Sequence, residues 1–383
     1  MKHVIAEAFF FSTIFLLAGC GAFSAASGEK GRTKEPVIFT AAVWNVQSLF
    51  DGQETGREYS EYLESAGWTA EKYAARITAI SQAVLHMPEL AAASQPVQTD
   101  SASRVSVPDL IGLVELENAG VLNDIAHGSL SKYGFFWTAF ANLPGSPLGV
   151  GFLSRVPLKE ARAHSITIGK DTAPRPVLEV RIEERGKPLV FLLCHWKSKL
   201  GGDIATETQR RASARVVQRR IQELKETEAG TPVIVMGDLN ENNDEFFRHS
   251  GKLLCALLPD DPGAAALVER STGALKECLV LSGDKPPRTS SFPEEACVLY
   301  SPWRDEMDGG SYYYKGEWET IDHFLLSDGL FNGSGWNFAS CRVLNHDPFT
   351  GSDGAPNPYV PRNGRGLSDH LPLLLCLRDS DGE

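Results

Sequence analysis

The sequence has 383 residues, enough for one large domain or two ordinary ones, and its 42% hydrophobic and 22% charged residues are typical of a globular protein with a sizeable core. The formal net charge of −12 argues against a histone-like or non-specific nucleic-acid coat protein. It does not exclude an enzyme that meets phosphate groups in a locally basic, metal-loaded cleft.

The first twenty residues form a segment of their own, in which Lys2 precedes a largely apolar run from Ala8 to Leu17. This run is too short to span a bilayer and is typical of a signal peptide. It ends in Leu17-Ala18-Gly19-Cys20, which resembles a bacterial lipobox, where the cysteine becomes lipidated. We therefore predict a lipoprotein signal peptide over residues 1–20 and a lipid anchor at Cys20. An ordinary signal peptide is the alternative.

The predicted anchor would place the protein in the bacterial cell envelope, at the periplasmic face or the cell surface. Residues 21–35 are small, polar and aperiodic, which is typical of a flexible tether. Eight short apolar runs follow, with turn residues between them, and predict β-strands. They cover residues 37–46, 110–116, 148–154, 177–182, 189–195, 232–238, 321–327 and 371–377. Most are nearly continuous in hydrophobicity, as in strands covered on both faces.

Two helices are predicted between these strands. The first covers about residues 69–87, with Thr69 as N-cap and Pro88 ending it. The second covers about residues 205–226 and carries several cations away from its apolar stripe. These are Arg210, Arg211, Arg215, Arg219 and Arg220. A cationic helix could contact nucleic acid, but a solvated or carboxylate-paired face is the commoner outcome.

Strands outnumber helices and are interspersed with them over residues 36–378, without a strong break in composition. This pattern predicts one layered α/β domain and argues against a plain doubly wound sheet. Residues 251–311 lack clear periodicity, so we expect an irregular insertion there. Residues 132–140, KYGFFWTAF, are predicted to form a buried strand.

Six cysteines follow Cys20. Cys194 and Cys376 lie in apolar runs that are typical of buried thiols. The other four are better candidates for disulfides in an exported protein. They are Cys255, Cys278, Cys297 and Cys341, and their spacing does not indicate a zinc site.

Polar side chains that could carry chemistry stand at the ends of the apolar runs, where functional groups gather on a rigid scaffold. They are Asn45, Glu115, His195, Asp238, Asn240, Asp322, Asp369 and His370. Each alone has an ordinary explanation, because Asp-Leu-Asn is usually a turn and a lone histidine is more often structural. Ser368, Asp369 and His370 are immediate neighbours, which does not supply the geometry of a serine-hydrolase triad.

Together these groups indicate metal-assisted hydrolysis of a phosphate ester. Glu115 and Asp369 are hard oxygen ligands suited to Mg²⁺ or Mn²⁺. Asp238 is a candidate base or orienting group for the attacking water. The remaining polar groups can hydrogen-bond the phosphate or the nucleophile, or orient an imidazole; they are Asn45, Asn240, His195, His370 and Asp322.

Seven motifs occur in an order that resembles the endonuclease/exonuclease/phosphatase superfamily. They read WNVQSLFD, IGLVELEN, GVGFLSR, CHWKSKLGG, VMGDLNE, YYYKGEWETIDHFLLS and GLSDHLPLL. That superfamily includes DNase I-like nucleases, exonuclease III-like repair enzymes, sphingomyelinases and inositol phosphatases. The resemblance covers residues 36–378 and implies a DNase I-like, four-layer α-β-β-α sandwich of two packed mixed β-sheets, with the site at one end.

The resemblance also implies a role for each matching position. Asn45, Glu115 and Asp369 would bind the metal, directly or through water. His195 would contact the scissile phosphate. Asp238 would activate or orient the water beside Asn240, and Asp322 would pair with His370.

Some neighbouring positions stay open. Lys197 and Lys199 flank His195 and could bind backbone phosphates, but solvated lysines are as common an outcome. The residue that accompanies His195 at the phosphate is not fixed, and the candidates are Tyr133, Tyr312, Tyr313 and Tyr314. Glu117 and Asn118 either support Glu115 or face solvent.

The leading hypothesis is a Mg²⁺-dependent phosphodiesterase, most specifically an envelope nuclease with no obligate protein partner. A rim of cations would face the phosphates; these are Lys197, Lys199, Arg210, Arg211, Arg362 and Arg365. A phospholipid or sphingolipid phosphodiesterase, or a phosphatase of a small ester, is the alternative on the same scaffold. A catalytically inactive binding module ranks lowest, since no acid or histidine position of the motifs is lost.

Overall fold

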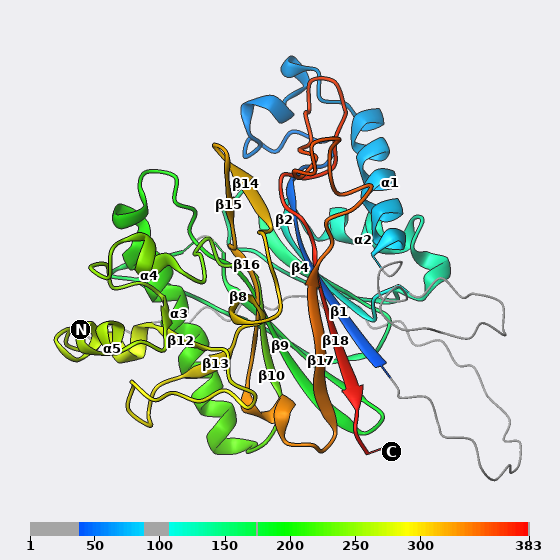
Figure 1. Ribbon diagram of the computed structural model, residues 1–383. Helices are drawn as coiled ribbons and strands as arrows, with labels where there is room; N and C mark the ends of the chain where they lie inside the picture. Colours follow the sequence, from blue (N-terminus) through cyan, green and yellow to red (C-terminus); the bar gives the residue numbers. More distant parts are fainter. Residues whose placement is uncertain (1–37, 88–106, 174, 382–383) are drawn as a thin grey trace, which may run out of the picture. The chain divides into compact units, whose positions relative to one another are not determined.

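The computed structural model describes residues 38–87, 107–173 and 175–381 (Figure 1). They belong to one compact unit, Thr33–Glu383. The predicted signal peptide, the predicted lipidation site Cys20 and the predicted tether lie outside the described residues. None of the helices in the described part has the length and hydrophobicity needed to cross a bilayer.

One of two large sheets has six strands in the order β17-β18-β1-β2-β4-β3. They are β1 (Ile38–Leu49), β2 (Leu110–Leu116), β3 (Trp137–Ala141), β4 (Gly149–Ser154), β17 (Trp336–Val343) and β18 (Leu373–Asp379). The central strands β1 and β2 are parallel, and the other neighbours are antiparallel.

The other large sheet has eight strands in the order β11-β12-β13-β16-β10-β9-β8-β5. They are β5 (Leu158–His164), β8 (Val177–Glu184), β9 (Lys187–His195), β10 (Val233–Asp238), β11 (Leu257–Pro259), β12 (Leu279–Ser282), β13 (Val298–Tyr300) and β16 (Asp322–Leu326). Two hairpins stand apart: β6 (Thr167–Ile168) with β7 (Asp171–Thr172), and β14 (Tyr312–Tyr314) with β15 (Glu317–Glu319).

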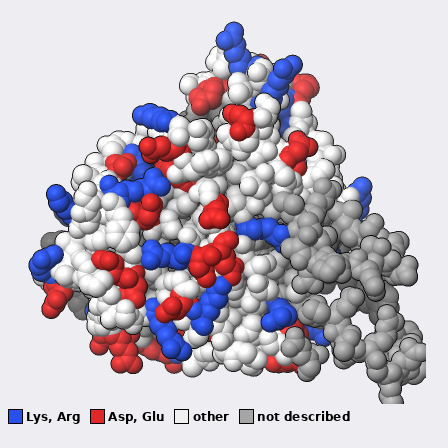
Figure 2. Space-filling model, viewed as in Figure 1, with Lys and Arg blue, Asp and Glu red and all other residues white. Residues whose placement is uncertain are grey.

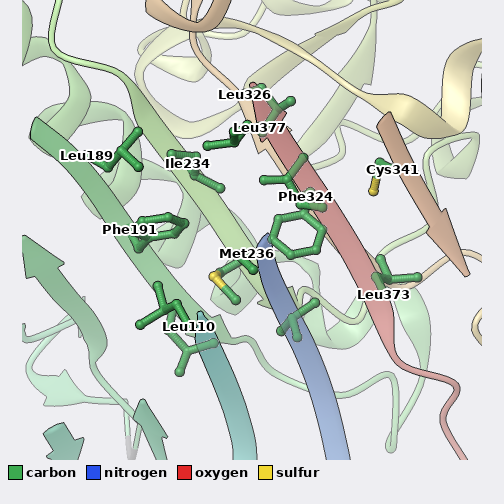
Figure 3. Close-up of a cluster of buried hydrophobic side chains, with 14 of the residues drawn as sticks. Leu110, Leu189, Phe191, Ile234, Met236, Phe324, Leu326, Cys341, Leu373 and Leu377 are labelled. Carbon is green, nitrogen blue, oxygen red and sulfur yellow. The ribbon is translucent and has the colours of Figure 1, made fainter. Parts of the chain in front are cut away.

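The two large sheets pack face to face over a core of buried apolar side chains (Figure 3). Leu110 and Leu377 come from the six-stranded sheet, and Phe191, Met236 and Phe324 come from the eight-stranded sheet. Alternate residues of each strand point to opposite faces, so each sheet also has an apolar outer face to bury.

Helices cover those outer faces. Core residues of α1 (Ala70–His86) and α2 (Ala119–His127) join the six-stranded sheet, and those of α3 (Asp203–Thr227) join the eight-stranded sheet. Two shorter helices are α4 (Glu245–Arg248) and α5 (Pro262–Glu269). Short 3-10 helices lie at Ser60–Tyr62, Glu64–Ala66, Ser131–Tyr133, Ala274–Glu277, Pro302–Arg304 and Asp328–Phe331. This arrangement confirms the predicted four-layer α-β-β-α sandwich (Figure 1).

The eight predicted strands and the two predicted helices are all present, with small differences at their ends. The Thr69 hydroxyl accepts a hydrogen bond from the backbone N–H of Lys72 and caps α1 as predicted. The arginines of α3 form ion pairs with carboxylates. The pairs are Arg210 with Glu207 and Glu241, Arg211 and Arg215 with Glu277, Arg219 with Glu223, and Arg220 with Glu179. The carboxylate-paired alternative for this helix is therefore confirmed.

Two expectations about element content were wrong. Residues 251–311 contribute β11, β12 and β13 to the eight-stranded sheet and bury a small apolar core of their own. These strands have three or four residues each, too few for a periodic signal. Residues 132–140 are not a buried strand, because β3 is a half-buried edge strand and Phe136 before it is 60% exposed.

The cysteines also differ from expectation. All six in the described residues are free and buried. Cys255, Cys278, Cys297 and Cys341 were the disulfide candidates, but each lies in an apolar core. Burial raises the pKa of the Cys278 and Cys297 thiols to about 12, so these groups are inert packing residues.

Candidate active site

The strand directions bring the polar strand ends to one edge of the sandwich. β1 runs parallel to β2, and β9 runs parallel to β10, so each pair ends at the same edge. β16 and β18 run opposite to β10 and β1, so their first residues reach that edge as well. In the register of the eight-stranded sheet, Asp238 stands between His195 and Asp322.

Asn45 joins the two sheets at this edge. Its amide Nδ2 donates to Glu115 Oε1 at 3.1 Å and to Asp238 Oδ2 at 3.0 Å. Its backbone carbonyl accepts a hydrogen bond of 2.6 Å from the Ser368 hydroxyl. The same hydroxyl accepts from the backbone N–H of His370 at 3.1 Å. Ser368 therefore acts as a local tie between β1 and the loop before β18.

A bulge in β1 holds the Glu115 carboxylate. Gln47, Ser48 and Glu115 all have positive φ, which is uncommon for residues with a Cβ and is tolerated where surrounding contacts fix it. The Ser48 N–H and hydroxyl donate to Glu115 Oε2 at 2.7 and 2.9 Å. The buried Arg76 of α1 stabilises this bulge from behind, since its guanidinium donates to the carbonyls of Val46, Gln47 and Ser48.

Asp238 ends β10 in a turn that requires the glycine before it. Gly237 has a φ of 136°, and a Cβ there would lie 1.9 Å from the carbonyl oxygen of Cys194. Asp238 Oδ1 accepts from the backbone N–H of Asn240 at 2.9 Å. The Asn240 amide donates to the carbonyl of Trp196 at 3.2 Å, which ties this turn to the end of β9.

His370 and Asp322 form a buried pair. His370 Nδ1 lies 2.8 Å from Asp322 Oδ2, and His370 Nε2 lies 3.9 Å from Asp238 Oδ2. Burial opposes protonation of the imidazole, but Asp322, Asp369 and Asp238 outweigh it and raise the pKa of His370 well above 6.5. His370 is therefore a cation at neutral pH.

Asp238 complements His370, because its carboxylate can accept a proton where the imidazolium can donate one. Burial, followed by the negative charge of Asp322, raises the pKa of Asp238 to about 7, although His370 opposes the shift. A carboxylate with a pKa near the working pH is suited to accept a proton. Cationic His370 beside Asp238 thus supplies a proton donor and a proton acceptor at one place.

Arg175 is a site residue that the sequence interpretation missed. Its Nη1 lies 3.0 and 2.9 Å from the Nδ1 and Nε2 atoms of His195. Burial, Arg175 and His370 lower the pKa of His195 well below 6.5, so this imidazole is neutral. The available signal was an arginine flanked by prolines directly before the strand VLEVRI, and its place beside His195 follows from the pairing of β8 with β9.

The acidic groups fit a divalent cation. Burial raises the pKa of Asp369 above its usual value, and the nearby Glu115 carboxylate adds to the shift against the effect of His370. Two neighbouring carboxylates are the type of oxygen ligand that suits a hard divalent cation. The side chains of Glu115 and Asp369 are 20% and 35% exposed, which leaves room for the waters that Mg²⁺ retains.

The side chains of Asp238, Asp322 and His370 form a deeper group whose ligand atoms are close enough together to hold a metal ion. Protonated His370 already compensates Asp322 there, so a cation would have to displace a proton in a dry environment. The Glu115 and Asp369 position is therefore the better candidate.

The predicted substrate-binding lysines differ from each other. Lys197 forms no ion pair with a carboxylate of the described residues. Lys199 lies 2.7 Å from Glu245 and 3.2 Å from Glu319, and these carboxylates, working against burial, raise the pKa of its ammonium group. This double ion pair explains why Lys199 is better suited to fixing the loop after β9 than to binding substrate.

Among the four candidate tyrosines, Tyr133 packs against the core beneath α1 and α2, away from His370. The Tyr312 ring packs 4.6 Å from the His370 ring, while Tyr313 and Tyr314 are exposed on the β14–β15 hairpin. Asn118 caps α2 by accepting from Val121, and Glu117 accepts from the backbone N–H of Asp51. Both residues after Glu115 therefore support the local structure.

Residues 40–256 match the sequence profile of the Endonuclease/Exonuclease/phosphatase family. Among solved structures, the fold is similar to truncated Caenorhabditis elegans TDP2, with 12% identity, a TM-score of 0.49, and coverage of 89% of this chain and 97% of that chain. It is also similar to an endonuclease/exonuclease/phosphatase family protein from Bacteroides thetaiotaomicron, with 14% identity, a TM-score of 0.46, and coverage of 90% and 99%. No curated protein matches the sequence.

Proposed function

The chain belongs to the Endonuclease/Exonuclease/phosphatase family, and we propose that it is a divalent-metal-dependent phosphodiester hydrolase acting on nucleic acid. The observation that carries this proposal is the buried cluster in which Asp238 lies within 4 Å of both His195 and His370. Such a cluster places a proton acceptor, a cationic donor and a neutral imidazole around one point.

In the proposed reaction, Asp238 accepts a proton from the attacking water, and Asn240 fixes the turn that holds this carboxylate. His370, oriented by Asp322, donates to the phosphoryl oxygens as negative charge grows there. Neutral His195 donates a hydrogen bond to the same group. The water oxygen would bond to phosphorus as the bond from phosphorus to the leaving oxygen breaks. The leaving oxygen would take a proton from solvent, and Asp238 would return its proton to solvent, which gives a phosphate monoester and an alcohol.

Mg²⁺ or Mn²⁺ held by Glu115, Asp369 and Asn45 would supply Lewis-acid charge at the phosphate. In the structure the Asn45 amide nitrogen faces Glu115 and Asp238, and its Oδ1 accepts from Gln47, so its contribution is as a hydrogen-bond donor or a ligand through water. The two carboxylates are the groups best placed for direct contact.

Nucleic acid is favoured as substrate by the cations around the site. Lys197 stands next to the end of β9, and Arg362 and Arg365 are exposed in the loop that leads to Asp369. Cationic side chains that contact phosphates provide affinity and register without sequence specificity. The rim is smaller than predicted, because Arg210 is fully buried and Arg211 and Lys199 are paired with carboxylates.

The proposed location is the bacterial cell envelope, with the chain attached through lipidated Cys20. The lipobox-like sequence Leu17-Ala18-Gly19-Cys20 supports this proposal. The residues concerned lie outside the described part of the chain. Metabolic labelling with a radioactive fatty acid would test the anchor, and Cys20→Ala should abolish the label.

A phospholipid phosphodiesterase is the second candidate, and the β14–β15 hairpin favours it. Tyr313 and Tyr314 are 41% and 49% exposed near a site residue, Tyr312. The sequence interpretation found no exposed apolar hairpin. An aromatic hairpin of this kind could rest on a lipid surface.

A substrate panel separates these possibilities. The purified protein would be incubated with duplex DNA, single-stranded DNA, RNA, sphingomyelin vesicles and a bis-phosphodiester, in Mg²⁺, Mn²⁺ or EDTA. We expect nucleic acid to be hydrolysed fastest, and EDTA to stop the reaction. Faster hydrolysis of sphingomyelin than of any nucleic acid would replace the nuclease proposal with the lipid alternative.

A further inference from the structure

A cavity of about 330 Å³ lies beside His195 and is not used by the mechanism above. The β6–β7 hairpin, the first half of α3 and the ends of β8 and β9 surround it. Its lining includes Arg175 and Lys197 next to His195, Ile168 on the hairpin, and Gln209 and Ser213 on α3. A cavity of this size accommodates a group as large as a phosphate with an attached sugar.

Neither cation of this cavity has a carboxylate oxygen within ion-pair distance among the described residues, although the charges of Glu115 and Asp238 act on Arg175 from farther away. The Lys197 ammonium contacts the Ser198 hydroxyl at 3.4 Å. Burial and then the charge of Arg175 lower the pKa of Lys197. The five arginines of α3 are all paired with carboxylates. The Arg175 guanidinium also contacts His195 and the carbonyl of Trp196. Its charge acts on Lys197 without a carboxylate in an ion pair with either group, so an anion between the two cations would relieve their repulsion.

The walls of the cavity are fixed by packing. Ile166 is buried against the apolar core under α3, and Ile168 packs against the same core. Arg215 of α3 donates to the carbonyl of Thr167 at 3.2 Å, which ties the hairpin to the helix. Asp171, the carboxylate in the lining, is exposed on β7. The site therefore has a fixed apolar wall, a polar floor from Gln209 and a cationic side facing His195.

We propose that this cavity is a substrate subsite that binds a second phosphate group, next to the scissile phosphate, between Arg175 and Lys197. The inference rests on the proposed function, because His195 marks the position of the scissile phosphate. A charge-assisted contact to phosphate is among the strong hydrogen bonds of proteins. The subsite would make the enzyme prefer substrates with two phosphates in succession over esters with one.

The test uses dinucleotides with one cleavable linkage. Hydrolysis of dTpdT is compared with that of its 5′-phosphorylated and 3′-phosphorylated forms, and a hexose bisphosphate is compared with the hexose monophosphate. We expect one phosphorylated dinucleotide to have a kcat/KM at least about tenfold above that of dTpdT. A similar preference confined to the hexose bisphosphate would assign the same subsite to a small ester.

Variants of the lining residues test whether the cavity causes the preference for a phosphorylated dinucleotide. Lys197→Met and Arg175→Gln should bring the ratio of the two kcat/KM values close to one, while Lys197→Arg should keep most of it. Lys159→Met is the matched control, because Lys159 is exposed on β5 with its ammonium 4.0 Å from Glu183. An unchanged ratio in Lys197→Met and Arg175→Gln would overturn the subsite.

Binding in EDTA separates this inference from the proposed function. The dissociation constants of the phosphorylated dinucleotides and of dTpdT are measured by calorimetry, where no turnover is expected. A phosphate-dependent difference that disappears in Lys197→Met supports the subsite even if no substrate is hydrolysed. Equal affinity for all three dinucleotides would exclude it, even if the enzyme proves to be a nuclease.

Discussion

At the scale of single residues, the charges of Asp238, Asp322 and His370 depend on one another. Asp322 accepts the Nδ1–H of His370 and faces Asp238 across the β10–β16 pair. Its negative charge contributes to the raised pKa of both neighbours. His370 can therefore keep its proton at neutral pH, while the pKa of Asp238 lies close to that pH.

Asp322→Asn tests this coupling. Removing the charge lowers the pKa of His370 and of Asp238, so both limbs of a bell-shaped kcat/KM profile should move to lower pH. The rising limb belongs to deprotonation of Asp238, and the falling limb to loss of the His370 proton. Asp328→Asn, an exposed change shortly after β16, is the control. Unmoved limbs in Asp322→Asn would contradict the assignment.

The sequence predicted eight polar residues of the cluster because each ends or begins an apolar strand. Sequence patterns did not identify Arg76 and Arg175 as part of the site, for different physical reasons. Arg76 lies on the buried face of a helix, and its partners are backbone carbonyls of a bulge, which leave no pattern in the sequence. Arg175 precedes β8, and only the pairing of β8 with β9 brings it to His195.

At the scale of elements, the bulge of β1 depends on a single side chain from α1. Arg76→Gln should destabilise the protein by about 2–4 kcal/mol, since buried carbonyls of the bulge lose their donor. It should also weaken Mg²⁺ binding, because Ser48 no longer holds Glu115. Urea unfolding and Mg²⁺ titration of activity measure the two effects. Arg57→Gln, an exposed change near the same loop, should alter neither.

A buried ion-pair network fixes the turn after β10. Arg210 is fully buried and contacts Glu207 and Glu241, whose other oxygens accept from the backbone of Ala256 and Leu257. The network therefore ties α3 to β10 and to the start of β11. This tie explains why residues 251–311 form part of the sheet.

Arg210→Met should cost about 3–5 kcal/mol of unfolding free energy, because two buried carboxylates lose their counter-charge. The measurement is urea unfolding at pH 7, followed by circular dichroism. Arg219→Met is the matched control on the solvent face of the same helix, with a side chain that is 66% exposed. Equal midpoints for the two variants would show that the network is dispensable.

At the scale of the whole molecule, the sandwich was predictable because its central strands are long and apolar, and their order matches a known family. The short edge strands β11, β12 and β13 and the β14–β15 hairpin were not, since their pairing depends on distant segments. Expected disulfides were absent among the described cysteines, because those cysteines pack into cores that the sequence could not delimit.

The distribution of surface charge is also a property of the whole molecule. On the face shown in Figure 2, acidic and basic side chains are interspersed, without a continuous basic patch. The net charge of −12 also gives no overall attraction for a polyanion. Under the proposed function, substrate recognition would then depend on the cluster at the sheet edge and the few cations beside it.

The most direct measurement of the central claim is the rate of bis(p-nitrophenyl) phosphate hydrolysis as a function of Mg²⁺ concentration, in the natural protein and in Asp238→Asn. We predict a rate that falls to background in EDTA, returns with Mg²⁺, and is lower by about 10³-fold in Asp238→Asn at every Mg²⁺ concentration. The variant should retain its circular dichroism spectrum. Hydrolysis at near-normal, Mg²⁺-dependent rates by folded Asp238→Asn would contradict the account.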